Sequence, residues 1–193
     1  MKSFEERLNQ VIPKLTSQDF LSNKGLGNEI GFWIFDYPPE RELEIRGFLD
    51  ECIIPALGKR QPALHVAHIN LFTFITDLLA ERNLLDKAIE MQQAQGDDKS
   101  LESLRRVLKE DKLAESLVSM IDHEKTDMLI LTGVGAVYPM LRTHTLLSAL
   151  HPHMKDTPLV MFYPGNYDGH SLKLFNKLSE DHYYRAFRLV PQN

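Results

Sequence analysis

The chain has 193 residues, 43% of them hydrophobic and 25% charged, so it is long enough to bury an ordinary core without disulfides or structural metals. The formal net charge is −5 and the basic residues are dispersed, which argues against autonomous binding to nucleic acid. The one cysteine, Cys52, fits a reducing cytoplasm and rules out an intramolecular disulfide, and no apolar run approaches the roughly 18 residues of a membrane span.

The N-terminal part predicts a helix and then a buried strand. Residues 3–15 carry apolar side chains at helical spacing on one face. A glycine-bearing loop at 25–30 leads into residues 31–35, a run of large apolar and aromatic side chains. Such a run predicts a strand that is buried on both faces. It stops at Asp36, in front of a pair of prolines.

A second helix and a second strand follow. Apolar residues form one stripe over residues 40–54, and Cys52 lies on that stripe, which predicts a core position for it. Pro55 and Gly58 are expected to end this helix. Residues 63–69 predict the second strand.

The long segment 71–122 is predicted to be helical throughout. Asn70 precedes it at an N-cap position, a polar break is expected at 92–98, and Ser100 is placed to cap a further helix. A connection between parallel strands needs only about a dozen residues. We therefore interpret 71–122 as a helical insertion that serves as an interaction surface or a lid, within one domain that spans residues 1–193.

Residues 127–150 read as a strand, a glycine turn and a helix, which is the central unit of an α/β sheet. The strand covers 127–132, and Gly133 and Gly135 form the turn. Pro139 is placed for the first turn of the following helix.

The C-terminal part predicts the remaining strands. Residues 159–163 form an apolar strand, a short helix is expected over 171–178, and residues 183–189 alternate like a half-buried edge strand. The predicted fold class is three-layer α/β, with a mostly parallel sheet of about five strands and the helical insertion between the second and third strands.

Ligands of such sheets bind at the carboxyl ends of the strands, where three loops are expected: 36–40, 132–139 and 163–169. The middle loop lacks the lysine of a phosphate-binding loop, and Tyr138 occupies the place of the third glycine in a dinucleotide fingerprint. A tight turn for helix packing and a contact to an anion, assisted by Arg142, both remain open.

Other polar residues also have two interpretations. His144 is the best functional candidate among the histidines, or a hydrogen-bonded helix residue. Asp36 and Asp168 can hold magnesium together, or one caps a helix and the other makes a turn. No nucleophile elbow or catalytic constellation is present in the sequence.

Several segments form a set that is more specific than any one of them. They are Gly25-Leu26-Gly27-Asn28-Glu29-Ile30 with Phe35-Asp36-Tyr37, Leu131-Thr132-Gly133-Val134-Gly135 with Tyr138-Pro139, Arg142 and His144, Phe162-Tyr163-Pro164-Gly165 with Tyr167 and Gly169, and Tyr183-Tyr184-Arg185-Ala186-Phe187. As a set, spanning about residues 20 to 190, they resemble the BrxB family.

The resemblance implies a place in a BREX bacteriophage-exclusion system, which marks host DNA by adenine methylation and blocks the replication of unmarked phage. It implies a small accessory protein without an established catalytic activity, which associates with the alkaline-phosphatase-like PglZ protein and with other BREX components. It carries over no catalytic residue and no cofactor.

Two hypotheses follow. The first is a non-catalytic interaction module without a cofactor or metal, and the alternative is a nucleotide-binding or nucleotide-sensing protein that uses the glycine loops. For either, the candidate residues for ligand or partner binding are Asp36, Tyr37, Gly133, Gly135, Tyr138, Arg142, His144, Gly165, Tyr167 and Asp168.

Overall fold

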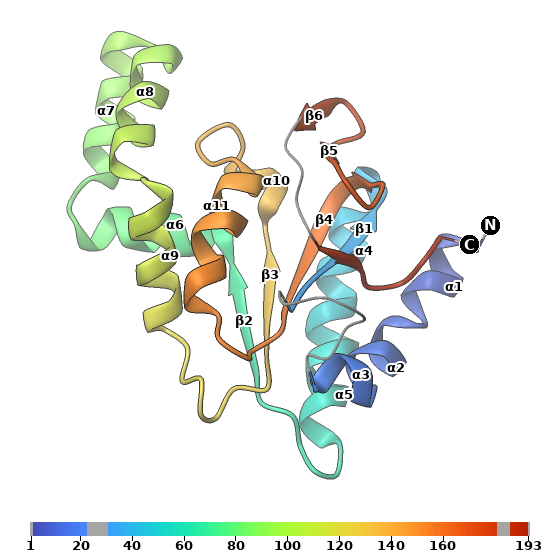
Figure 1. The fold of residues 1–193 in the computed structure, drawn as a ribbon. Coiled ribbons are helices and arrows are strands. Elements are labelled where there is room, and N and C mark those ends of the chain that lie inside the picture. Colours follow the sequence, from blue (N-terminus) through green and yellow to red (C-terminus); the bar gives the residue numbers. More distant parts are fainter. Residues whose placement is uncertain (1, 23–30, 181–185, 193) are drawn as a thin grey trace.

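The structure is a computed structural model that describes residues 2–22, 31–180 and 186–192. It confirms the prediction of a mixed α/β fold with a mostly parallel central sheet (Figure 1). The main strands lie in the order β2-β3-β4-β1-β7, and each neighbouring pair is parallel. Their bounds are β1 Phe32–Tyr37, β2 Val66–Asn70, β3 Met128–Thr132, β4 Leu159–Tyr167 and β7 Phe187–Arg188.

Side chains of the central strands alternate between two hydrophobic clusters, one on each face of the sheet. In β1, Phe32 and Ile34 belong to one cluster, and Trp33 and Phe35 to the other. The first cluster contains residues of α6 (Leu71–Glu81), α9 (Glu110–Ser119), α10 (Val134–Val137) and α11 (Thr143–Leu150). The second contains residues of α1 (Phe4–Leu8), α2 (Val11–Leu15), α3 (Gln18–Leu21), α4 (Glu42–Phe48) and α5 (Ile54–Lys59).

The helical stretch after β1 does not end at Pro55. A 3₁₀ turn, Pro39–Arg41, leads into α4, a π-helical segment follows at Leu49–Ile53, and α5 continues to Lys59. The Ile54 N–H donates to the Leu49 carbonyl, five residues back, as in a π-helix. This wider turn comes immediately before the proline, which stands in the first turn of α5 where its missing N–H costs little.

Cys52 is exposed, so the prediction that it lies in the core is wrong. The buried positions of this stretch recur every four residues, slightly more than the regular 3.6-residue period, as expected when a wider π turn lies between two α-helical segments. They are Ile45, Leu49, Ile53 and Leu57.

The segment between β2 and β3 is helical, as predicted, and consists of four helices: α6, α7 (Leu85–Gln95), α8 (Asp97–Val107) and α9. The break between α6 and α7 was not predicted. The Asn70 cap is confirmed, since its Oδ1 accepts from the N–H groups of Phe72 (3.0 Å) and Thr73 (3.3 Å). The break expected at 92–98 is shorter than predicted: only Gly96, with a φ of +85°, lies between α7 and α8. Ser100 lies inside α8, not at its cap, and its Oγ donates to the Ala88 carbonyl.

The segment 171–178 is not a helix. Leu172–Leu174 (β5) and Leu178–Glu180 (β6) form antiparallel strands that continue from β4. Leu172 and Leu174 are buried on either side of the exposed Lys173, which is a strand period. Phe175 and Asn176 have positive φ, so the chain turns where a helix would have to continue.

Three other boundaries differ from the predictions. The first helix is two helices, α1 and α2, separated at Asn9 and Gln10. The second strand begins at Val66 rather than at 63. Pro139 lies between α10 and α11 instead of in a helix, since the residue before a proline is biased towards extended backbone and Tyr138 is extended. The loop 25–30 and residues 181–185 lie outside the described residues.

Candidate functional site

The carboxyl end of the sheet, where a ligand was predicted, contains the continuation of β4. The connection after β3 packs on one face through α10, and that after β1 packs on the other through α4. In open α/β sheets this divergence opens a crevice for ligands. Here β4, which lies between β1 and β3, extends to Tyr167 and pairs with β5. The chain itself therefore occupies the crevice.

Asp36 ends β1 in a buried position, with 1% of its surface exposed. Its carboxylate forms an ion pair with Arg7 and lies 3.6 Å from the Arg188 guanidinium. It also accepts hydrogen bonds of 3.0 Å from the Tyr167 N–H and the Gln192 side chain. The carboxylate thus joins α1, β1, β4 and the C-terminal segment, and the two ends of the chain lie side by side (Figure 1).

A cavity of about 190 Å³ adjoins this carboxylate. It brings together residues from two of the three predicted loops, including Asp36, Tyr37, Gly165 and Asn166. No residue of the segment 133–144 lines it. Gly165 is needed there because a Cβ would collide with the Lys173 carbonyl of β5. The structure therefore separates the predicted site into two parts.

The glycine turn after β3 is closely packed. Gly133 has a left-handed φ of +73°, and a Cβ on it would lie 2.5 Å from the Asn70 Oδ1. A Cβ on Gly135 would lie 2.7 Å from the Phe175 ring and 3.1 Å from Pro164. These contacts match the interpretation of the glycines as a tight turn for packing. The loops 132–139 and 163–169 do meet, through this contact.

Two tyrosines among the candidates are held by hydrogen bonds. The Tyr37 hydroxyl donates to Glu42, and burial, together with this carboxylate, raises the pKa of the phenol. The Tyr167 hydroxyl donates to the Ala186 carbonyl at 2.7 Å and lies 3.0 Å from the Gly169 carbonyl. Both side chains thus join strand ends to neighbouring segments.

The remaining candidates lie along the segment from α10 to α11. Tyr138 is 38% exposed. Arg142 is an exposed N-cap residue of α11, and His144 is buried in that helix. Among the described residues, no three His, Cys, Asp or Glu side chains are grouped as metal ligands would be. None of the described helices combines the length and apolar character needed to cross a membrane.

Asp168 makes a turn outside the sheet. Its carboxylate accepts from the N–H groups of His170 and Ser171 and from the Ser171 hydroxyl, at 2.7 to 2.8 Å. These bonds, first that from the Ser171 side chain, lower the pKa of Asp168 from 3.8 to about 2.

We expect a pH-dependent contribution from this turn. Because the pKa of Asp168 is lower in the folded chain, its contribution to stability is present above pH 4 and is lost as the pH falls towards about 2. Carboxyl-carbon NMR titration should give a midpoint near the lowered value, and Ser171→Ala should raise it. An unchanged midpoint in that variant would contradict this assignment.

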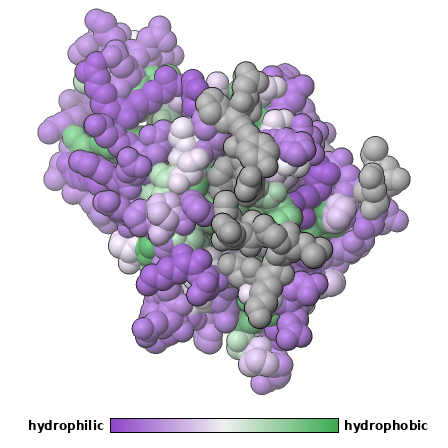
Figure 2. All heavy atoms as spheres, viewed as in Figure 1, coloured by the Kyte–Doolittle hydropathy of each residue, from purple (hydrophilic) through white to green (hydrophobic). Residues whose placement is uncertain are grey.

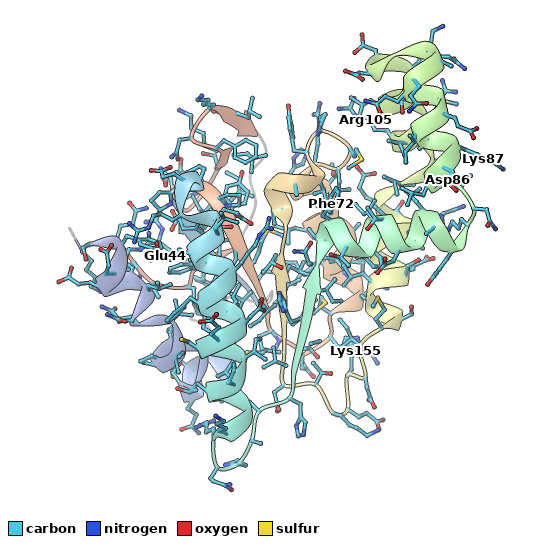
Figure 3. The ribbon with its side chains drawn as sticks, turned by 180° about the vertical axis from the view of Figure 1, so that it is seen from behind. Glu44, Phe72, Asp86, Lys87, Arg105 and Lys155 are labelled. Carbon is cyan, nitrogen blue, oxygen red and sulfur yellow. The ribbon has the colours of Figure 1, made fainter. Side chains whose placement is uncertain are left out.

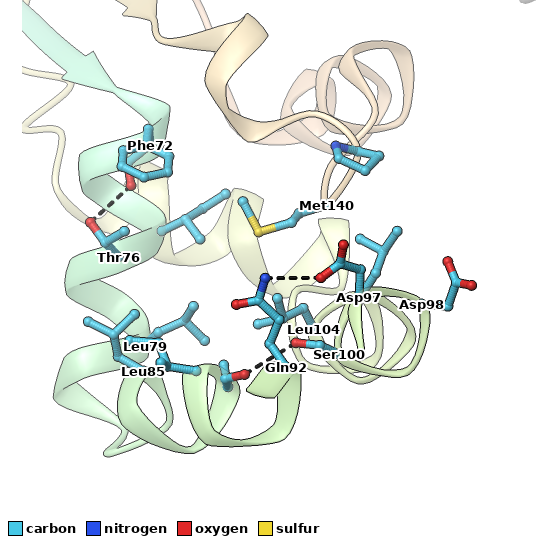
Figure 4. A pocket seen from close by; sticks show the side chains of 15 residues that line it. Phe72, Thr76, Leu79, Leu85, Gln92, Asp97, Asp98, Ser100, Leu104 and Met140 are labelled. Carbon is cyan, nitrogen blue, oxygen red and sulfur yellow. Dashed lines mark hydrogen bonds between the residues drawn. The ribbon is translucent and has the colours of Figure 1, made fainter. Parts of the chain in front are cut away.

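A second cavity is an apolar groove of about 560 Å³ between α6, α7, α8 and the Tyr138–Arg142 segment (Figure 4). Phe72, Leu79, Leu85, Leu104 and Met140 are among its lining residues. Arg105 of α8 joins two walls of this groove, because it donates from Nε (3.1 Å) and Nη2 (2.9 Å) to the Pro139 carbonyl. Most of the lining residues belong to the segment 71–122, for which the prediction of an interaction surface or a lid stays a prediction.

The hairpin of α7 and α8 stands out from the sheet (Figures 1 and 3). None of the α7 residues is fully buried, and Phe72 and Ile89, at the groove, are 44% and 46% exposed. In Figure 2 the coloured residues on the side in view are mostly hydrophilic, with smaller hydrophobic patches among them. The groove is therefore an apolar surface that the described residues leave uncovered.

Two comparisons with known proteins agree. The model of the family described as "BREX protein BrxB" matches residues 67–189. A "BREX protein BrxB" of Bacillus cereus (strain H3081.97) is 40% identical over 192 residues, which cover 98% of this chain and 99% of that protein. Another "BREX protein BrxB", of Escherichia coli O9:H4 (strain HS), is 40% identical over 187 residues, 97% of this chain and 92% of that protein. No solved structure matches the chain significantly. The chain therefore belongs to the BrxB family, as its sequence motifs suggested.

Proposed function

We propose that this chain is a non-catalytic component of a BREX anti-phage system and that it binds the PglZ-type, alkaline-phosphatase-like protein of the same system. Membership of the BrxB family supports a role in such a system. The observation that carries the interaction role is the uncovered apolar groove at α6, α7 and α8. The chain would act in the cytoplasm, as a protein partner that does not bind nucleic acid by itself.

The residues at the sheet end support a structural role for most of the predicted site. Asp36 is neutralised by Arg7, and its second oxygen accepts from the Tyr167 N–H. The turn at Gly133 and Gly135 is packed against side chains of the same chain. The alternative, nucleotide binding at the glycine loops, has less support, because a phosphate needs the space beside those glycines.

Co-expression with the PglZ-type protein of the same operon tests the proposal. A tag on this chain should retain that partner, and the complex should survive moderate salt because apolar burial is screened little by ions. The isolated chain is expected to show no ATPase, phosphatase or nuclease activity. Failure to retain the partner from co-expressing cells would contradict the proposed function.

A further inference from the structure

Three helices, α6, α7 and α8, each line the groove with one helical face. On each helix the lining residues recur at positions i, i+3, i+4 and i+7, which is the spacing of one helical face. They are Phe72, Ile75, Thr76 and Leu79 in α6, Leu85, Ala88, Ile89 and Gln92 in α7, and Asp97, Ser100, Leu101 and Leu104 in α8. Three faces around one groove are the arrangement that a fourth helix completes in a bundle.

The groove also has the dimensions of a helix site. Helices α7 and α8 have 11 residues each. At 1.5 Å per residue this is about 16 Å, or three turns, so an occupant can present two or three successive apolar side chains. Met140 closes one side of the groove, and its unbranched side chain adapts readily to a partner.

The charge around the groove restricts the occupant further. Of the lining residues, Asp97 and Asp98 are the charged ones, and both are exposed in the first turn of α8. Asp97 accepts a 3.0 Å hydrogen bond from Gln92, and within the described part of the chain neither carboxylate forms an ion pair. In Figure 4 both lie across the groove from Phe72. Two carboxylates attract basic side chains and repel nucleic acid or anionic lipid.

We propose that this groove receives an amphipathic α-helix of a partner protein, with its apolar face on α6, α7 and α8 and with Lys or Arg residues beside Asp97 and Asp98. This inference rests on the proposed function and deepens it, because it specifies the surface and the kind of segment bound. Helices that dock in grooves are recognised through apolar anchors at the spacing seen here.

Variants of the exposed groove residues test the docking surface. Ile89→Arg and Phe72→Arg should each weaken binding of the co-expressed PglZ-type protein by about tenfold or more, because a charge would enter an apolar contact. The double variant Asp97→Asn, Asp98→Asn should weaken it by roughly two- to fivefold, as for exposed ion pairs. Leu43→Arg is the matched control, since Leu43 is 79% exposed on α4, a helix of the opposite face.

The outcomes separate this inference from the proposed function. If the wild-type chain binds the partner and both groove variants bind it with the same affinity, the inference is overturned and the proposed function stands. Absence of any complex with the wild-type chain would overturn both. Loss of affinity in Leu43→Arg alone would place the partner on the other face and would also overturn the inference.

A photo-crosslinking residue at position 89, in the same complex, identifies the occupant. The expected product joins this chain to a partner peptide with helical apolar spacing and Lys or Arg at one end. A product with a second copy of this chain, or with a peptide that lacks this pattern, would overturn the inference. Each variant is expected to fold, because the replaced side chains are partly exposed in the free chain. Thermal unfolding of each purified variant checks this.

Discussion

Replacement of Asp36 by asparagine is expected to lower the free energy of unfolding by about 3 to 5 kcal/mol, which is the usual cost of removing one partner from a buried ion pair. Asparagine keeps the shape of the side chain but removes the charge that neutralises Arg7. The Arg7 guanidinium would then stay buried without a counter-charge, and the join between α1, β1 and the C-terminal segment would weaken. Urea denaturation followed by circular dichroism measures the loss.

The exposed ion pair of Glu5 and Arg41 provides the control. Glu5→Gln, in the same helix as Arg7, should lower the stability far less than Asp36→Asn, because exposed ion pairs are screened by water. The double variant Arg7→Met, Asp36→Asn should lose less unfolding free energy than the two single variants lose together. In the double variant neither side chain of the pair is left as a buried charge without its partner. An Asp36→Asn protein as stable as Glu5→Gln would show that the carboxylate has no structural role.

Replacement of Gly133 by alanine is expected to cost about 2 to 3 kcal/mol, from two sources. The first is the left-handed backbone at φ +73°, which is unfavourable for a residue with a Cβ. The second is the Asn70 side chain, whose Oδ1 would lie 2.5 Å from the new Cβ and would have to leave its position at the start of α6. That movement breaks the hydrogen bonds that cap α6.

Gly47→Ala is the matched control for this variant. Gly47 lies in α4, and a Cβ there meets no atom within 4 Å. Alanine should therefore stabilise the chain by about 0.5 to 1 kcal/mol, because glycine is unfavourable inside a helix. Calorimetric melting of both variants gives the signs directly. A Gly133→Ala protein with wild-type stability would leave a ligand contact as the remaining reason for a glycine at this position.

Local sequence patterns were reliable where one period fitted a segment. The apolar runs of β1, β3 and β4 predict buried parallel strands, because side chains on both faces of a covered sheet must be apolar. Asn70 predicts the start of α6, because its side chain can satisfy N–H groups that no helix can satisfy itself. The motifs that resemble the BrxB family also predicted the membership that the comparisons show.

The segment 171–178 shows where such patterns fail. Four apolar residues in eight fit both a helix and a hairpin, and the choice depends on pairing with the end of β4, which the apolar spacing within the segment does not reveal. The π-helical segment at Leu49–Ile53 is a similar case, since it changes the buried stripe and exposes Cys52 without any break in the helix-forming sequence.

The sequence by itself determined the family, the class of fold and the absence of a recognisable catalytic motif, because these depend on residue identity and short-range spacing. Only the tertiary structure decided what surrounds the candidate residues. It places Arg7, an arginine on the apolar face of the first helix, against Asp36, and it fills the sheet-end crevice with the extension of β4. It also leaves α6, α7 and α8 with an uncovered apolar groove, because which helical faces meet is set by long-range packing that no local period specifies.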